Sequence, residues 1–430
     1  MVTTAFINIW GERVGAVAWD QKSAIGSFEF EPAFLEKDQN LSPIKLPIKN
    51  AQKRIFTFPE LKGSDTFKGL PGLLADTLPD NYGNALLNTW LTARGRPTDS
   101  LNPVETLCFI GKRGMGALEI EPAHGGSGSV SKNLEIETLI HIVEKILTKK
   151  KNFSLKAGTK EEKAFYDILK IGTSAGGARA KAVVAFNKNT EEIRSGQFFA
   201  PEGFEHWLIK FDGVTDKQFG SSNGYGRVEM AYYEMAKDAG LEMMESKLLE
   251  EQDRAHFMTK RFDRDENGDK IHVQTFCAIR HFDFNDILVY SYEQLFETMR
   301  MLRLPYPQAE QMYRRMAFNV MSRNCDDHTK NFAFMLEKDG VWKLAPAYDV
   351  CHAYRPGSEW VNQHSLSVNG KRSGITRKDL LDVAYQMNVK KAPKILDEIL
   401  EVVSDWEKYA KDQSVEPVLM DAIYKTLALI

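Results

Sequence analysis

The sequence has few cysteines, little net charge and no long apolar run, and each of these excludes a class of protein. Only four of the 430 residues are cysteines, and no two of them form a C-x-x-C pair. We therefore expect neither a zinc site nor a disulfide framework, and we place the chain in the cytoplasm. No apolar run approaches the roughly 18 residues of a membrane span. Residues 1–10 lack the basic and apolar regions of a signal peptide and are interpreted as a strand.

The charge balance also excludes a class of protein. A formal net charge of −3 does not mark a stand-alone nucleic-acid binder, which would be basic. Hydrophobic residues make up 43% and charged residues 27%, as in an ordinary soluble globular protein. The length exceeds the size at which a single core stops growing, so two or three domains are expected.

The pattern of apolar residues predicts an α+β chain. Residues 5–60 favour short strands, with a hairpin between 5–10 and 14–19, and residues 70–97 favour helix with Asp80 as a cap. A glycine-serine stretch at 124–131 is a plausible linker. Further along the chain we expect helices at 133–149, 160–170 and 227–239, the last ending at Gly240, strands at 206–211 and 257–262, and mainly helix from residue 291 except for a hairpin near 331–346.

The segment 324–332 (NCDDHTKNF) has the residues that phosphoryl transfer requires. A kinase needs a carboxylate to orient the attacking hydroxyl and accept its proton, and oxygen ligands for Mg²⁺. In protein kinases the catalytic Asp and the metal-binding Asn lie five positions apart. Asp326 lies five positions before Asn331 and Asp327 only four, so the spacing selects Asp326 as the base.

A second metal ligand is predicted after a hairpin. Two apolar runs flank an Asp-Gly turn at residues 339–340, and the second run leads to Asp349. Such a hairpin returns the chain to its starting point, so Asp349 can join Asn331 on Mg²⁺. Each acid taken alone favours a structural role, such as capping a helix; the joint order of base, spacing, hairpin and acid favours catalysis.

The phosphate-binding side is less distinctive. Residues 170–181 (KIGTSAGGARAK) are rich in glycine, which lets backbone N–H groups approach phosphates, but they match neither G-x-G-x-x-G nor a Walker A loop. A plain flexible turn is the alternative. Lys210 ends a predicted strand, as does the lysine that pairs with the α- and β-phosphates in kinases, and Glu229 on the next helix is placed to hold it. The alternative is a surface lysine and a solvated acid.

Several motifs follow one another in a recognisable order. They are residues 70–80 (LPGLLADTLPD), residues 114–118 (GMGAL), Ser174, Gly177 and Lys181 in the pattern S-x-x-G-x-x-x-K, residues 260–264 (KRFDR) and residues 324–331 (NCDDHTKN). In this order the chain resembles the HipA family of toxin Ser/Thr protein kinases from toxin–antitoxin systems. The resemblance covers nearly the whole chain.

The resemblance implies a fold and a function. The fold is α+β and protein-kinase-like with two lobes: a HipA-type N-terminal subdomain at 1–123, a small lobe at 132–265 and a helical lobe at 266–430. Members use ATP and Mg²⁺ to phosphorylate a protein substrate, in known cases an aminoacyl-tRNA synthetase. A small helix-turn-helix antitoxin that binds operator DNA neutralises them, and autophosphorylation of a loop serine, matched here by Ser174, inactivates them. No membrane partner is implied.

The same resemblance assigns the nucleotide site. The residues expected to bind ATP are Gly176, Gly177, Ala178, Arg179, Ala180, Lys181, Lys210, Lys260, Arg261, Phe262, His328, Lys330, Asn331, Tyr348 and Asp349. The sequence departs from the family pattern at Lys260, which replaces an acid. Asp349 is followed by Val350 and Cys351, so a DFG-type switch is not expected.

Two other functions fit the same residues. The first is a small-molecule kinase, against which the N-terminal subdomain argues, since simple metabolite kinases lack one. The second is a catalytically idle pseudokinase that acts as an antitoxin-binding or co-repressor module. The intact Asp326, Asn331, Asp349 and Lys210 argue against an idle site.

Overall fold

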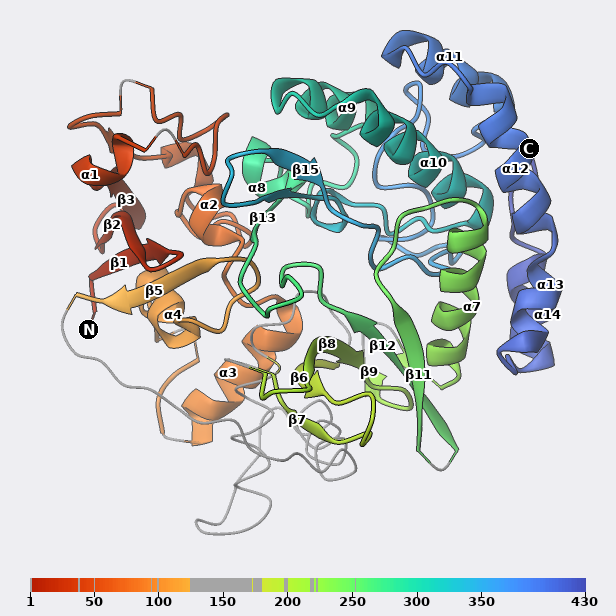
Figure 1. Cartoon of the computed structure of the whole chain (residues 1–430), viewed down its shortest axis with the longest axis horizontal. Helices are drawn as coiled ribbons and strands as arrows, with labels where there is room; N and C mark the ends of the chain where they lie inside the picture. The colour runs from red at the N-terminus through yellow and green to blue at the C-terminus, as the bar shows by residue number, and fades with distance from the viewer. Residues whose placement is uncertain are drawn as a thin grey trace. The chain divides into compact units, whose positions relative to one another are not determined.

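The computed structural model describes residues 2–37, 39–49, 51–93, 95–98, 100–123, 172, 180–196, 200–216, 220–221, 223–251 and 253–430. The chain forms two compact units (Figure 1). Unit 1 comprises residues 1–41, 46–226 and 249–273, and unit 2 comprises residues 42–45, 227–248 and 274–430. Among the described helices, none combines the length and hydropathy of a transmembrane segment.

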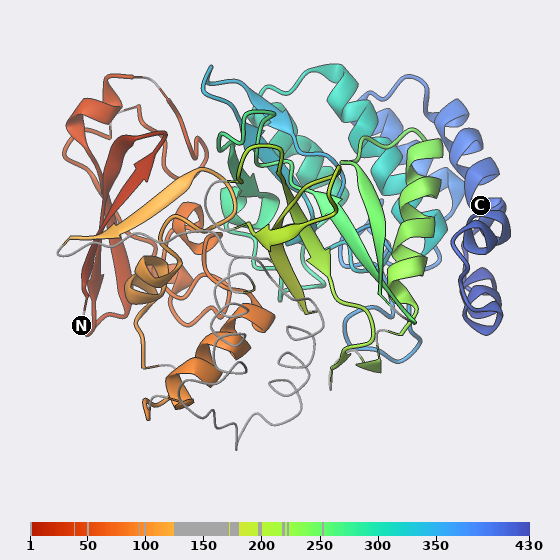
Figure 2. The same ribbon diagram turned by 60° about the horizontal axis from the view of Figure 1, so that its bottom comes forward.

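An antiparallel sheet of five strands opens unit 1. Its strands are β1 (Thr4–Ile9), β2 (Glu12–Asp20), β3 (Ile25–Phe30), β4 (Ile55–Phe56) and β5 (Leu118–Pro122), in the order β4-β3-β2-β1-β5. Alternate residues of β1 are fully buried, as expected for a sheet with one face on the core. The hairpin predicted at 5–10 and 14–19 is confirmed, and Figure 2 shows β5 alongside β1 at the sheet edge.

Short helices complete the N-terminal part of unit 1. They are α1 (Pro32–Leu35), the 3₁₀ turn η1 (Pro59–Leu61), α2 (Gly72–Ala75), α3 (Asn81–Ala93) and α4 (Pro103–Ile110), the last of which packs on the sheet. The helical pattern predicted at 70–97 is confirmed as α2 and α3. Asp80 caps α3 as predicted, since its Oδ1 accepts the backbone N–H of Gly83 at 2.8 Å.

A second sheet of unit 1 carries the lysines of the candidate site. It contains β6 (Lys181–Phe186), β7 (Ile193–Ser195), β8 (Glu205–Lys210), β11 (Ser246–Glu251, whose first three residues belong to unit 2) and β12 (Arg254–Lys260), in the order β11-β12-β8-β6-β7. The two-stranded ribbon of β9 (Thr215–Asp216) and β10 (Gly220–Ser221) follows β8 in the sequence. All six residues of β6 are buried. The strands predicted at 206–211 and 257–262 are confirmed. Only glycine fits at position 226, where a Cβ would meet the Ala255 carbonyl oxygen at 1.8 Å.

Unit 2 is mainly helical (Figure 1). Its elements are α7 (Tyr225–Asp238, whose first two residues belong to unit 1), β13 (His272–Thr275, which begins in unit 1), α8 (Phe276–Arg280), α9 (Tyr292–Met301), α10 (Tyr306–Ser322), η2 (Thr329–Asn331), β14 (Ala333–Leu336), β15 (Trp342–Leu344), α11 (Arg377–Met387), α12 (Ala392–Ser404), α13 (Trp406–Asp412) and α14 (Pro417–Tyr424). The C-terminal half of α10 is buried, and α12 packs along it. The helix predicted at 227–239 is confirmed, and Gly240 follows it with φ +78°.

One prediction about unit 2 is wrong. We expected helix on both sides of the 331–346 hairpin, but residues 345–376 form an irregular segment held by bridges and side-chain hydrogen bonds. The periodicity of the flanking helices does not extend into this segment. Some of its backbone hydrogen bonds are internal, as from His364 to Arg372, and others reach residues outside it, as from Ser367 to Tyr290. The predicted linker at 124–131 and the helices at 133–149 and 160–170 lie outside the described residues. The threefold domain division stays a prediction.

Candidate active site

The two adjacent acids of the 324–332 segment have opposite environments. The Asp326 side chain is 46% exposed, whereas the Asp327 side chain is fully buried. Only Asp326 therefore presents a carboxylate to an incoming group. The sequence favoured Asp326 over Asp327 as the candidate base from spacing alone, and burial favours the same residue by an independent criterion.

Asp327 is bound on both carboxylate oxygens. Its Oδ2 accepts a hydrogen bond from the Tyr292 hydroxyl at 2.8 Å and lies 2.8 Å from His364 Nδ1. Its Oδ1 accepts the backbone N–H of Ser365 at 2.7 Å. Burial alone would lower the pKa of His364, but the charge of Asp327 and its hydrogen bond more than offset this and raise the pKa to about 10. His364 and Asp327 therefore form a buried ion pair at neutral pH.

Asn331 lies beside Asp326 and is oriented by it. The Asn331 side-chain N–H donates to the Asp326 carbonyl oxygen at 2.6 Å. Because the amide nitrogen is committed in this way, Asn331 Oδ1 is the atom left for a ligand. Amide oxygen is a donor type that Mg²⁺ accepts.

The residue before Asp349 is hydrogen-bonded to the segment that carries Asn331. The Tyr348 hydroxyl donates to the Lys330 carbonyl oxygen at 2.7 Å, which joins the residue before Asp349 to the residue before Asn331. The hairpin that the sequence predicted between Asn331 and Asp349 is confirmed as β14–β15, which pairs Phe334 with Leu344.

The backbone at Asp349 is unusual for a residue with a side chain. Its φ is +52°, in the left-handed region that residues other than glycine seldom adopt. Residues held in such conformations cluster at functional sites, where the surroundings maintain the strain. No group of three or more His, Cys, Asp or Glu side chains in the described part of the chain could hold a metal. A magnesium ion bound by one or two protein ligands and by substrate phosphates does not need such a group.

His328 and Lys330 share one aromatic neighbour. The Phe284 ring lies 5.2 Å from the His328 ring, and Lys330 Nζ lies 4.9 Å from the Phe284 centroid. His328 Nε2 is 3.8 Å from Asp326 Oδ1. His328 Nδ1 is buried and has no hydrogen-bond partner among the described residues, which leaves it able to accept one from a ligand.

The two lysines of unit 1 lie opposite each other. Lys181 on β6 pairs with Lys210 on β8, so both side chains are on the same face of the sheet. Lys181 is 2% exposed. On the other side of Lys210, Phe257 is its partner on β12, and Lys210 Nζ lies 5.7 Å from the Phe257 ring centroid. Like charges directly opposite each other destabilise a sheet, so this face suits an anion.

The segment 260–264 is built around a buried carboxylate. Arg261 donates to Asp263 from Nε and Nη2 at 2.8 and 2.6 Å, and Arg264 Nη1 donates to it at 2.8 Å. The backbone N–H of Gly116 donates to the same carboxylate at 2.7 Å. Burial alone would raise the pKa of Asp263, but the two guanidinium groups offset this and lower it. The Arg261 side chain is thus bound by Asp263, and a nucleotide contact of this segment would come from its backbone.

Other residues assigned to the nucleotide site have separate positions. Lys260 Nζ forms an ion pair with Glu205 at 2.8 Å, and Phe262 is half-buried. The Ala180 carbonyl accepts the backbone N–H of Phe211 at 3.0 Å. Glu229 is buried on α7 in unit 2, and its pairing with Lys210 stays a prediction. Ser174, Gly176, Gly177, Ala178 and Arg179 lie outside the described residues.

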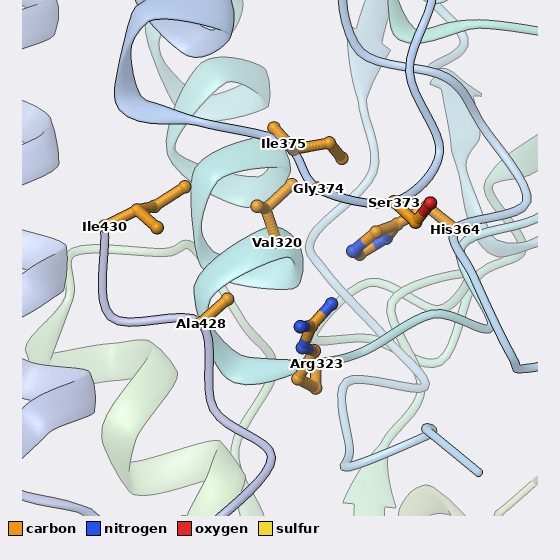
Figure 3. A pocket seen from close by; sticks show the side chains of 8 residues that line it. All are labelled: Val320, Arg323, His364, Ser373, Gly374, Ile375, Ala428 and Ile430. Carbon is orange, nitrogen blue, oxygen red and sulfur yellow. The ribbon is translucent and has the colours of Figure 1, made fainter. Parts of the chain in front are cut away.

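A cavity of about 260 Å³ is lined in part by His364, the partner of Asp327 (Figure 3). Its walls come from the end of α10, the irregular segment and the C-terminal residues; they are Val320, Arg323, His364, Ser373, Gly374, Ile375, Ala428 and Ile430. Figure 3 shows the His364 ring and the Arg323 guanidinium on the same side of this space.

Sequence reasoning missed the residues that hold Asp327. Tyr292 begins α9, and His364 and Ser365 lie in the irregular segment, 35 to 38 positions from Asp327. None belongs to a short motif. The only signal available was the second acid itself, because an Asp beside a candidate base either shares its role or is buried against a partner.

Comparisons with known proteins agree with this architecture. HipA of Shewanella oneidensis MR-1, in a complex with HipB and operator DNA, matches with a TM-score of 0.69 over 99% of this chain and 96% of that chain, at 15% identity. At this identity the likeness shows the fold, and the predicted fold class is confirmed. The proinflammatory kinase CtkA of Helicobacter pylori matches with a TM-score of 0.32 at 14% identity, over 58% of this chain and 92% of that one, too weakly to support an inference. No curated protein matches the sequence.

Family models match two parts of the sequence. The HipA N-terminal domain matches residues 5–121, and the HipA-like C-terminal domain matches residues 173–406. The second match alone covers more than half of the chain. The chain therefore belongs to the HipA family.

Proposed function

We propose that this chain is an ATP-dependent Ser/Thr protein kinase that acts as the toxin of a toxin–antitoxin pair. One observation carries the proposal. The half-exposed Asp326 lies beside Asn331, and a hydrogen bond joins the residue before Asp349 to the residue before Asn331, which supports the order and spacing that phosphoryl transfer by protein kinases uses.

Each group of residues has its own role in this proposal. Asp326 orients the acceptor hydroxyl and takes its proton. Asn331 and Asp349 hold Mg²⁺, and Lys181 and Lys210 bind phosphate oxygens. When bound, ATP supplies the phosphoryl group, and Mg²⁺ neutralises its charge. Positioning and electrostatic stabilisation provide nearly all of the rate enhancement in such sites.

The described residues fit these ligands. Asn331 offers an oxygen whose amide nitrogen is already bound, His328 Nδ1 is a buried acceptor without a partner among the described residues, and Lys181 and Lys210 bring two cations to one sheet face. Phosphate oxygens suit ammonium groups that share one face of a sheet.

The biological role rests on the family. We propose that the substrate is a translation-related protein such as an aminoacyl-tRNA synthetase, and that a small helix-turn-helix antitoxin neutralises the chain and links it to operator DNA. We also propose that autophosphorylation of Ser174 inactivates the enzyme. We also propose a cytoplasmic location, where cysteines remain thiols, as the four cysteines of this chain are.

The decisive experiment replaces the proposed base. Asp326→Asn should lower phosphoryl transfer by about 10²- to 10⁴-fold, the usual contribution of a general base, while ATP binding stays measurable. The assay follows transfer of labelled phosphate from Mg-ATP to proteins of a cell extract and to the chain itself. Asp286→Asn, an exposed acid elsewhere in unit 2, is the matched control and should keep full activity.

Three results would contradict parts of this proposal. Wild-type transfer rates in Asp326→Asn would exclude Asp326 as the base. Transfer to metabolites but to no protein would indicate a small-molecule kinase. Absence of any ATP turnover by the wild-type chain would indicate an idle binding module.

A further inference from the structure

We propose that His364 is a positioning residue for the candidate catalytic loop, and that it holds Asp326 in place through the buried Asp327 carboxylate. The proposal rests on the function proposed above for Asp326. His364 itself does not reach the reacting atoms; it acts on the residue next to the base.

The residues on both sides of Asp326 are anchored, whereas the Asp326 side chain is half-exposed. Before it, the Cys325 backbone N–H donates to the Ala353 carbonyl at 3.0 Å. After it, Asp327 accepts the three hydrogen bonds from Tyr292, His364 and Ser365 described above. Asp326 therefore lies between two residues that are held by hydrogen bonds. Cys325 is held through its backbone, and Asp327 is held through its side chain.

Among the described residues that donate to Asp327, only His364 brings a compensating charge. A buried carboxylate is costly unless it is paired with a cation and hydrogen-bonded, and Tyr292 and the Ser365 backbone are neutral donors. Arg372 acts on Asp327 only at longer range, since its own donors bind the backbone carbonyls of Ile287, Tyr290 and Ser365.

The other groups that face the His364 ring leave this pairing intact. Cys325 Sγ lies 3.7 Å from His364 Nε2, and the Arg323 guanidinium shares the cavity with the ring. Asp327 raises the pKa of His364 to about 10, so the ring is charged at neutral pH. The stabilisation from the pair is complete below the ordinary histidine pKa of 6.5 and is lost as the pH rises through about 10.

The cavity provides a way to test His364 directly. His364 forms part of the wall of the 260 Å³ space in Figure 3. Removing its side chain enlarges a space that already exists, and a free imidazole molecule can occupy it and donate to Asp327. A ring with the same shape and no charge cannot replace the ion pair.

The experiment measures the activity and loop protection of His364→Ala in the full chain at pH 7. We expect kcat to fall roughly 10- to 100-fold, as for other residues that orient a functional side chain without contacting the ligand. The KM for ATP should change little. Added imidazole should restore kcat in a saturable manner. Pyrazole, a ring of the same size that is neutral at this pH, should not.

Amide hydrogen exchange of residues 323–331 provides a readout that does not depend on catalysis. Exchange should increase in His364→Ala and return toward the wild-type rate with imidazole. If exchange responds in this way but the wild-type chain transfers no phosphate, the positioning role stands and the proposed kinase function fails. Unchanged exchange and unchanged kcat in His364→Ala would overturn the positioning role.

Two further variants separate positioning from general loss of stability. His272→Ala removes another buried histidine, which lies in unit 1 and whose Nε2 is 3.2 Å from the backbone carbonyl oxygen of Leu41. Its activity should not respond to imidazole, and a response would contradict the proposal. If His364→Ala does not fold, His364→Gln keeps a hydrogen-bond donor without the charge; normal kcat and normal exchange in this variant would likewise overturn the role of the charged pair.

Discussion

The lysine-bearing sheet of unit 1 and the Asp326 loop of unit 2 place their functional side chains in different ways. In the sheet, the strand register determines the side-chain positions. Lys181 and Lys210 lie opposite each other because β6 and β8 are paired residue by residue. In the loop, the backbone has no such ladder. Asp326 is placed by Asn331, by the Cys325–Ala353 bond and by the Asp327 cluster.

This difference determines what each region tolerates. A side chain placed by register can be replaced without moving its neighbours, because backbone hydrogen bonds hold the strand. A side chain placed by a cluster of side chains depends on every member, and removing one leaves a buried polar group without its partner. We therefore expect substitutions in the sheet to affect ligand contacts alone, and substitutions around the loop to affect geometry.

The largest expected effect tests the loop at its metal ligand. Asp349→Asn removes the charge and keeps the shape, and asparagine tolerates the positive φ of this position, so the fold should survive. Loss of a metal-binding charge should remove several kcal/mol of transition-state stabilisation, or roughly 10³-fold in kcat/KM. Steady-state kinetics over a range of Mg²⁺ concentrations measure this.

The control for Asp349 is another acid of the same hairpin. Asp339→Asn changes the exposed turn between β14 and β15 and should leave the kinetics unchanged. Full activity in Asp349→Asn at every Mg²⁺ concentration would remove Asp349 from the metal site.

The same difference explains how much the sequence could predict. The strands around Lys210, the hairpin after Asn331 and the cap at Asp80 follow from periodicity, spacing and residue type within short windows, and all three are confirmed. Spacing also selected Asp326 over Asp327. These features are local, so the information for them lies within a few residues.

The features that sequence reasoning missed depend on distant contacts. Nothing around His364 indicates that it binds Asp327, because the segment between residues 345 and 376 has no periodicity from which its path could be derived. The hydrogen bonds that Asp263 accepts from Arg261 and from the backbone N–H of Gly116 were equally hidden. Contacts of this kind appear only once the fold is known.

An intermediate effect tests the sheet. Lys181→Met and Lys210→Met remove one cation each and keep most of the side-chain length. Each charged hydrogen bond to phosphate is worth about 1.5–3 kcal/mol, so we expect kcat/KM for ATP to fall by roughly one to two orders of magnitude. Hydrogen exchange of the Asp326 loop should not change in either variant.

The double variant sharpens this test. If both lysines bind the same phosphate group, their effects should not add, whereas independent sites should give additive effects. Lys188→Met is the matched control, because Lys188 lies in the turn after β6 and pairs with Glu205. Faster amide hydrogen exchange in the Asp326 loop after either lysine substitution would contradict the idea that substitutions in the sheet affect ligand contacts alone.

The smallest expected effect concerns the helix cap at Asp80 in unit 1, and it tests whether this residue stabilises only its own helix. Asp80→Ala removes the acceptor for the Gly83 N–H and should lower the free energy of unfolding by about 1 kcal/mol, the usual value for a helix N-cap. Asp80→Asn keeps an acceptor and should recover most of this loss in urea denaturation. A loss above about 3 kcal/mol would exceed any cap. It would mean that Asp80, like Asp327, is part of a side-chain cluster. Side chains of unit 1 would then depend on distant contacts as well as on strand register and helix capping.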